Sequence, residues 1–278
     1  MNDVAALTRT RPIVPIVAVG VLAGFLAGLF GIGGGILVVP GLVLVLGMHQ
    51  RLAHGTSLAA VLPISVASML TYAWHDNVDW TVALLLSIGS ATGVLAGTAY
   101  LHVAKTRTLT ILFAVVLIAS AIRLFIPVDA DGRADLSVLG AALTIAIGLA
   151  SGTLAGVLGV GGGVIVVPAL ILGFGVLPVI AKGTSSAAII PAAMIGTWRN
   201  RSNGNADVPT AAIVGVSGVL TAIAGGIVSD HLDDDVAVIL FAVLLTAVAA
   251  RLLWQLHTDD SNGEADSPSD SPPGSNRS

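Results

Sequence analysis

Two short polar clusters in this 278-residue chain each join a basic side chain to a glycine and two hydroxyls. One reads "AHGTS" and the other "AKGTS", and each stands at the expected start of a long apolar segment. Cationic side chains, hydroxyl donors and the free N–H groups of a helix N-terminus all favour an anion. We therefore predict an anion-binding site written twice, which consists of His54, Gly55, Thr56, Ser57, Lys182, Gly183, Thr184 and Ser185.

Each cluster also has a simpler interpretation. The threonine and serine hydroxyls could merely cap the N-termini of their own helices. Lys182 could extend along the membrane edge towards water, and His54 could be a polar group at that edge.

A run of glycines precedes each cluster. "GIGGGILVVP" begins at Gly31 and "GVGGGVIVVP" begins at Gly159. Consecutive glycines and a proline disfavour a helix, so each run predicts a break in the backbone. At membrane depth such a break must face protein or a water-filled cavity, because unpaired backbone groups are costly in lipid. The residues predicted to line that cavity are Gly31, Gly33, Gly34, Gly35, Pro40, Gly159, Gly161, Gly162, Gly163 and Pro168.

The glycine runs have two other interpretations. The glycines could simply allow a tight hairpin between two helices. A nucleotide-binding loop is disfavoured, because the spacing is not G-x-G-x-x-G and no Lys-Ser/Thr pair follows. Matched interruptions in two halves of a membrane protein are, in contrast, a pointer to a transporter's binding site.

The composition indicates a membrane protein. Hydrophobic residues make up 55% of the chain and charged residues 10%, against about 25% charged in soluble domains. Several apolar stretches approach the roughly 20 residues that a spanning helix needs. The absence of cysteine excludes disulfides and thiolate metal sites. We predict no metal, no cofactor and no nucleic-acid partner.

The chain consists of one unit written twice. Residues 20–57 align with residues 148–185 without a gap, half of the aligned residues are identical, and the offset of 128 continues towards the end of each half. Internal repeats of this kind define the architecture. The predicted divisions are an N-terminal cytoplasmic segment (1–12), a first repeat (13–126), a linker (127–140), a second repeat (141–254) and a disordered acidic tail (255–278).

Each repeat contains about five hydrophobic segments. The predicted segments are 13–30, 35–48, 54–74, 81–103, 108–126, 141–158, 163–176, 182–198, 208–228 and 236–254. The second segment of each half is short for the ~30 Å hydrocarbon core. The protein therefore has either ten spans with inverted halves or eight spans with parallel halves.

Basic residues collect in cytoplasmic loops of membrane proteins, and this pattern favours the ten-span, inverted arrangement with both termini in the cytoplasm. In that arrangement the residues expected inside are Arg9, Arg11, Arg51, Lys105, Arg107, Arg199, Arg201 and Arg251. The loops expected outside are mostly acidic. We predict an all-α polytopic protein of the cell membrane.

An "N-x-D" pattern ends in Asp79 in the first half and in Asp207 in the second. A turn followed by a helix cap accounts for it. A gate or a proton site is the alternative.

The doubled "GxGGG-x-x-x-VP" followed by "GTS" resembles the sulfite exporter TauE/SafE family over both halves, about residues 13–254. This resemblance implies a membrane transporter of sulfur-containing anions. The chain departs from its own repeat by carrying His54 where the second half carries Lys182.

The expected function is a secondary transporter of a small anion, such as sulfite, a sulfonate or a related oxyanion, by alternating access. No ATP-binding motif is present, so the expected driving force is an ion gradient, of protons or sodium, or the gradient of the anion itself. An anion channel is the nearest alternative. An intramembrane enzyme is disfavoured, because the sequence shows no catalytic triad or paired carboxylates within a span.

Overall fold

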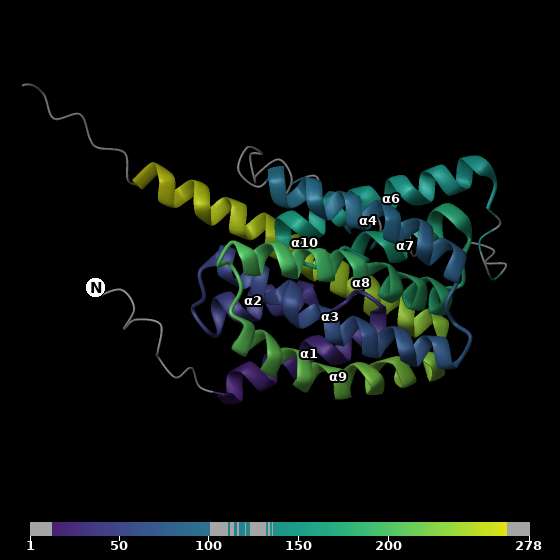
Figure 1. Cartoon of the computed structure of the whole chain (residues 1–278), viewed down its shortest axis with the longest axis horizontal. Coiled ribbons are helices and arrows are strands. Elements are labelled where there is room, and N and C mark those ends of the chain that lie inside the picture. The colour runs from purple at the N-terminus through teal and green to yellow at the C-terminus, as the bar shows by residue number, and fades with distance from the viewer. Residues whose placement is uncertain are drawn as a thin grey trace, which may run out of the picture.

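In the computed structural model the helices of the chain lie side by side along one long axis (Figure 1). The structure describes residues 13–100, 111, 114, 115, 117–119, 121, 122, 132, 134 and 136–265. The helices are α1 (Ile13–Phe30), α2 (Gly35–Leu44), α3 (Gln50–Trp74), α4 (Trp80–Tyr100), α6 (Val138–Leu158), α7 (Gly163–Phe174), α8 (Pro178–Ser202), α9 (Val208–His231) and α10 (Asp234–Ala265). The described residues within 111–122 are helical as well.

Several helix ends differ from the prediction. Both α3 and α8 begin four residues before the expected starts at 54 and 182. Helix α6 begins inside the predicted linker, with Ser137 as its N-cap. Helix α10 continues to Ala265, so residues 255–265 of the predicted tail are helical, while the rest of that tail lies outside the described residues.

Two close helix pairs flank the bundle. A Cβ added at Gly24 would overlap the carbonyl oxygen of Gly218, and one at Gly28 would overlap that of Ala222, so α1 and α9 run parallel at backbone contact. Helices α4 and α6 pack in the same way through Gly89, Gly93 and Gly97. Small residues four apart allow this approach in lipid. Helices α3 and α8 lie between the two pairs (Figure 1).

The two halves run in opposite directions. Gly31, at the end of α1, packs against the backbone of Lys182 near the start of α8. Gly159, at the end of α6, packs against His54 near the start of α3. The start of α3 in turn lies beside the end of α8, because Gly55 faces the carbonyl of Asn205. Helices α1 and α6 are therefore antiparallel, and the predicted inverted repeat is confirmed.

Helices α2 and α7 are short. Ten and twelve residues correspond to about 15 and 18 Å, less than the ~30 Å hydrocarbon core. Helix α2 folds back along α1, since Gly41 packs on Val19 while Gly34 packs on Ala23. Among the residues that the structure describes, six helices are long and apolar enough to cross a membrane by length and composition, namely α1, α3, α4, α6, α8 and α9. The exact count of ten spans stays a prediction.

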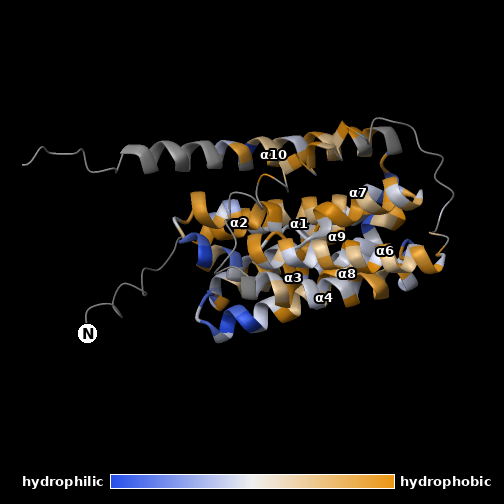
Figure 2. Ribbon diagram, turned by 90° about the horizontal axis from the view of Figure 1, so that it is seen from above, coloured by the Kyte–Doolittle hydropathy of each residue, from blue (hydrophilic) through white to orange (hydrophobic). Residues whose placement is uncertain are grey.

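Hydrophobic residues predominate along the helices and hydrophilic residues gather towards the ends of the bundle (Figure 2), and many large apolar side chains on the helices are exposed. Helix α10 runs along one face and joins the core through Phe241, whose ring stacks on Phe30 at a centroid distance of 5.3 Å. Such an exterior suits lipid rather than water. The fold is that of a polytopic membrane protein.

Candidate functional site

The two glycine breaks meet each other at the centre of the bundle. Gly31 and Gly159 have φ values of 66° and 67°, in the left-handed region that suits glycine. A Cβ at Gly35 would lie 2.6 Å from the carbonyl carbon of Val160, and one at Gly163 would lie 2.8 Å from the Cα of Ile32. The breaks therefore cross in backbone contact, which no hairpin within a single half requires.

The breaks end before the prolines. Gly34 and Gly162 are the left-handed N-cap residues of α2 and α7, and neither provides a side-chain hydrogen bond to its helix. Pro40 and Pro168 lie inside those helices rather than at the interruption. The glycines alone thus make each break, and the prolines follow within the helix.

The "GTS" clusters do not open their helices, which corrects the prediction. His54 and Lys182 are the fifth residues of α3 and α8, and Thr56 and Thr184 are the seventh. Only the first four N–H groups of a helix lack helical partners. The backbone at both clusters therefore belongs to the helical ladder, and the threonines do not cap their own helices.

The threonines instead bind the opposite half. Thr56 Oγ1 accepts a hydrogen bond of 2.9 Å from the backbone N–H of Asp207. Thr184 Oγ1 accepts one of 2.9 Å from the backbone N–H of Asp79. Gly183 lies against the carbonyl of Asn77, as Gly55 does against that of Asn205. The glycine and threonine of each cluster therefore fit the N-x-D corner of the other half.

The two aspartates act as helix caps. Asp79 accepts hydrogen bonds of 3.1 Å from the backbone N–H groups of Thr81 and Val82 at the start of α4. Asp207 accepts one of 3.1 Å from Thr210 at the start of α9. The cap interpretation of the N-x-D pattern is thus what the geometry supports, and a gating role remains a prediction.

His54 and Ser57 hold the second break. His54 Nδ1 lies 3.0 Å from the carbonyl oxygen of Val157, and since a carbonyl only accepts, Nδ1 donates. Ser57 Oγ donates to the carbonyl of Gly159 at 2.9 Å. Two residues of the predicted site in the first half therefore brace the break of the second half.

Lys182 lies inside the bundle. Its side chain is 3% exposed, and its Nζ donates to Ser229 Oγ at 2.9 Å. Its backbone packs against Gly31 at the first break, while its ammonium reaches Ser229 on α9. A buried ammonium agrees with the interpretation of Lys182 as part of an anion site. It disagrees with the interpretation of Lys182 as a side chain extended towards water.

Ser185 differs from its counterpart Ser57. Its side chain is fully buried, yet its Oγ has no hydrogen-bond partner among the described residues. Ser65 Oγ, also fully buried, has none either, and it lies 3.1 Å from where a Cβ of Gly33 would be. Buried hydroxyls are normally paired, so these two are unusual.

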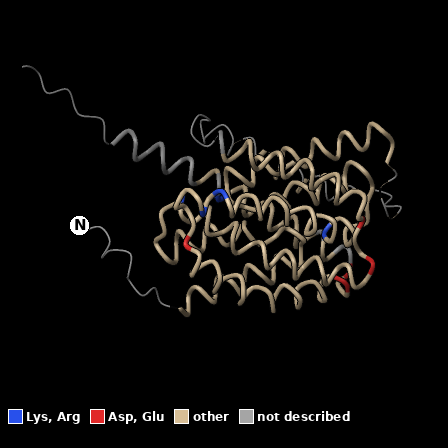
Figure 3. The backbone as a smooth tube through the Cα atoms, in the orientation of Figure 1, with Lys and Arg blue, Asp and Glu red and all other residues tan. Residues whose placement is uncertain are grey.

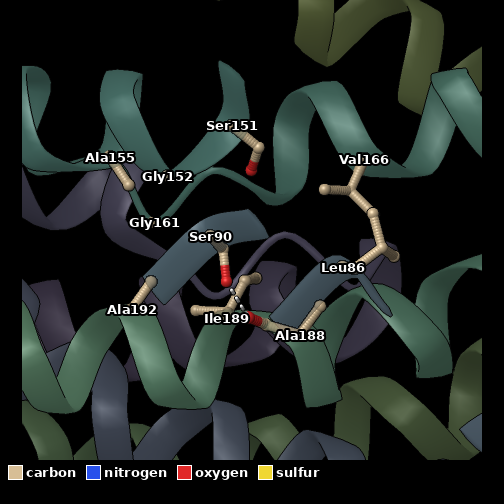
Figure 4. A pocket seen from close by; sticks show the side chains of 10 residues that line it. All are labelled: Leu86, Ser90, Ser151, Gly152, Ala155, Gly161, Val166, Ala188, Ile189 and Ala192. Carbon is tan, nitrogen blue, oxygen red and sulfur yellow. Dashed lines mark hydrogen bonds between the residues drawn. The ribbon is translucent and has the colours of Figure 1, made fainter. Parts of the chain in front are cut away.

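A narrow internal pocket adjoins the second break (Figure 4). It contains about 220 Å³ of space between atoms, but this space is too narrow to hold a water molecule. Ser90 and Ser151 project into it from α4 and α6, and Gly161 and Ile189 form part of its wall (Figure 4). Ser90 Oγ donates to the carbonyl of Ala188 at 3.0 Å, and Ser151 Oγ to that of Gly162 at 2.9 Å. Sequence reasoning missed Ser65, Ser90 and Ser151.

Most charged residues lie towards the two ends of the bundle (Figure 3). Arg51 at the start of α3 shares one end with Arg199 and Arg201 at the end of α8. Asp76 follows α3 at the other end, where Asn77 donates to Asp230 at 2.9 Å. Within the part of the chain that the structure describes, no group of three or more His, Asp or Glu side chains could hold a metal ion.

The family model described as "Sulfite exporter TauE/SafE" matches residues 4–142 and again residues 143–276. The "Probable membrane transporter protein YunE" of Bacillus subtilis is 24% identical over 86% of this chain and 97% of its own length. The "Probable membrane transporter protein MJ0441" of Methanocaldococcus jannaschii is 31% identical over 65% of this chain and 69% of its own length. A "Probable membrane transporter protein" of Xylella fastidiosa (strain 9a5c) is 42% identical over 38% of this chain and 41% of its own length. No solved structure matches.

Proposed function

The chain belongs to the sulfite exporter TauE/SafE family of membrane transporters, and from that premise we propose that it is a secondary transporter of a small anion. The proposed substrate is sulfite, a sulfonate or a related oxyanion, in line with the description of the family. The proposed location is the cell membrane, with both termini in the cytoplasm. The proposed coupling ion is a proton or sodium.

One observation carries this proposal: two left-handed glycine breaks of an inverted repeat touch at the centre of the bundle. Transporters built from inverted repeats bind substrate where interrupted helices meet near the bilayer midplane. Helices α2 and α7 both begin at this crossing. The N-terminus of a helix is the positive end of its dipole and favours an anion.

The buried cation supports an anionic substrate. Lys182 lies beside the first break, and its ammonium is within the protein rather than in solvent. An anion that approaches the crossing would meet this charge in surroundings of low dielectric constant, where it acts more strongly than at a surface. His54, the equivalent residue in the other half, adds charge when it is protonated.

Tight packing favours a transporter over an open channel. The narrow pocket beside the crossing does not admit water. A continuous pore would need a hydrated path, whereas alternating access needs a closed centre between two openings. The channel remains the alternative function, and it predicts flux without exchange.

Reconstitution into proteoliposomes tests the proposal. Vesicles are loaded with unlabelled sulfite, sulfate, a sulfonate or a carboxylate, and entry of the same labelled anion is followed. A transporter accumulates label transiently by counterflow and saturates with anion concentration. Flux that neither saturates nor exchanges would favour the channel, and no movement of any sulfur oxyanion would refute the proposed substrate class.

A further inference from the structure

The narrow pocket lies at one of two places that the repeat makes equivalent, and the other place lies between α1, α2, α3 and α9. Its hydroxyl-bearing residues Ser90 and Ser151 correspond, at the offset of 128, to Gly218 and Ala23. The repeat has thus placed two hydroxyls in one copy of this space and none in the other. Helix packing alone does not require this difference, because the small residues suffice for packing between α1 and α9.

The two copies also differ in bulk. Ala192 lines the pocket, and Ile64 occupies the corresponding position on α3. Ile64 Cδ1 lies 2.6 Å from where a Cβ of Gly218 would be, so the isoleucine fills that copy of the space. The pocket exists because alanine replaces isoleucine on α8. Of the two places that the repeat made equivalent, one therefore carries hydroxyls and a narrow space, and the other is filled by an isoleucine.

The side chain of Ile189 separates the pocket from the first break. Its Cδ1 lies 3.0 Å from the Cβ position of Gly33 and 2.8 Å from that of Gly163, while the same residue lines the pocket. Ser65 Oγ, which has no hydrogen-bond partner among the described residues, lies 3.1 Å from the same position of Gly33. Movement of this one side chain would join the pocket to an unpaired hydroxyl.

We propose that this pocket is the substrate site, that Ser90, Ser151 and Ser65 donate hydrogen bonds to a small oxyanion there, and that Ile189 fills the space when the site is empty. The inference rests on the proposed transport of anions and gives that function a location. It shifts the principal contacts away from the threonines of the "GTS" clusters, which bind the corners of the fold.

The chemistry of the wall selects an acceptor-rich ligand. None of the lining residues is acidic, and the polar side chains among them are the two serines, which can turn their O–H groups from backbone carbonyls to a ligand. Gly161 brings the uncapped start of α7 to the same wall. Hydroxyl donors and a helix N-terminus suit an anion with several oxygens on one atom. The small volume excludes large organic anions.

Substitution Ala192→Ile tests the location, because it restores the residue that fills the symmetry-related space. Ala187→Ile is the matched control: it adds the same bulk to α8 at a half-buried residue outside the pocket. Counterflow by the wild-type protein is measured first with sulfite, sulfate and methanesulfonate. Absence of counterflow with all three anions would refute the proposed transport function, and not only the proposed site. In an active protein, Ala192→Ile is expected to reduce uptake about tenfold or more at equal folded yield, while Ala187→Ile retains it.

A second measurement does not depend on transport. The chain has no cysteine, so Ala192→Cys provides a single thiol in the pocket. Alkylation of this thiol in purified protein is followed with chloride, methanesulfonate or sulfate present; sulfite is left out because it reacts with thiol reagents. Methanesulfonate or sulfate is expected to slow alkylation severalfold relative to chloride. Rates that neither anion changes, or equal loss of uptake in the two isoleucine variants, would overturn the proposed site.

Discussion

Thr184 on α8 accepts a hydrogen bond from the backbone N–H of Asp79, the residue that caps α4. The two residues belong to opposite halves of the chain. The pair Thr56 and Asp207 repeats this contact at the other end of the bundle. Both bonds are formed at once in this conformation. An opening that separates α8 from the α3–α4 corner would break the first, and an opening at the opposite end would break the second.

Thr184→Val removes the acceptor and leaves the buried N–H of Asp79 unpaired. We expect the free energy of unfolding to fall by about 1–3 kcal/mol, the cost of an unsatisfied buried donor. Thr184→Ser keeps the acceptor and is expected to remain close to wild type. Thermal unfolding of both variants in detergent measures the difference, and equal melting temperatures would argue against the bond as a stabilising contact.

Gly31→Ala places a Cβ against the backbone of Lys182 at a residue with φ of 66°. Gly47 also has a positive φ, of 60°, but no atom lies near its Cβ position. We expect Gly31→Ala to cost about 2–5 kcal/mol and Gly47→Ala about 1–2 kcal/mol. The yield of monodisperse protein and its melting temperature compare the pair. Similar behaviour of the two variants would show that only backbone strain matters.

Lys182→Ala removes the buried cation beside the first break. Loss of a charged hydrogen-bonding partner corresponds to about 1.5–3 kcal/mol, so anion affinity is expected to fall roughly ten- to a hundredfold. Lys182→Arg should retain part of the affinity, because the charge persists while the geometry changes. Saturation of initial uptake measures affinity, with Thr144→Ala as a control on a buried hydroxyl bonded within its own helix. Unchanged affinity in Lys182→Ala would leave the lysine a structural role alone.

His54 gives a prediction about pH. If its charged form attracts the anion, uptake should weaken as the pH rises and the imidazole loses its proton. His54→Lys should remove this dependence, because lysine stays charged over the same range. The pH profile of initial uptake in the two proteins is the measurement. A profile that His54→Ala leaves intact would reduce this histidine to its contact with Val157.

Single cysteines test the orientation. Asp76 and Ser202 are both exposed and lie at opposite ends of the bundle. We expect a membrane-impermeant thiol reagent to modify Asp76→Cys on intact cells and Ser202→Cys only after the membrane is opened, because the arginine-bearing end should face the cytoplasm. The reverse pattern would invert the assignment of the two sides.

The repeat and its interruptions could be predicted from the sequence because they are written in identical residues. A run of glycines predicts a break from local sequence alone, without knowledge of what packs against it. The length of an apolar stretch likewise predicts most of the helices. The predicted starts of α3 and α8 lie four residues too late, although Pro178 at the first position of α8 is a common start signal. The prediction instead starts each helix at its basic residue, which is the fifth residue of the helix in the structure.

The partners of the threonines could not be predicted, since Thr56 and Asp207 are 151 residues apart and meet only through the antiparallel packing of the halves. The pocket was missed for a different reason. Comparison of the repeats emphasised what they share, whereas Ser90, Ser151 and Ala192 lie where they differ. The sequence does contain a signal for the pocket, because Ser90 and Ser151 stand where the other repeat has Gly218 and Ala23.

Each flanking pair joins a helix of one repeat to a helix of the other: α1 to α9 and α4 to α6. A single repeat, taken as a separate polypeptide, would expose its glycine faces to lipid without a partner. It could bury them only against another copy inserted upside down in the same membrane. The present chain therefore has the form expected after duplication and fusion of a gene whose product was a homodimer of dual orientation. After the fusion the two copies of the central space could diverge, so that one carries hydroxyls and the other is filled by isoleucine.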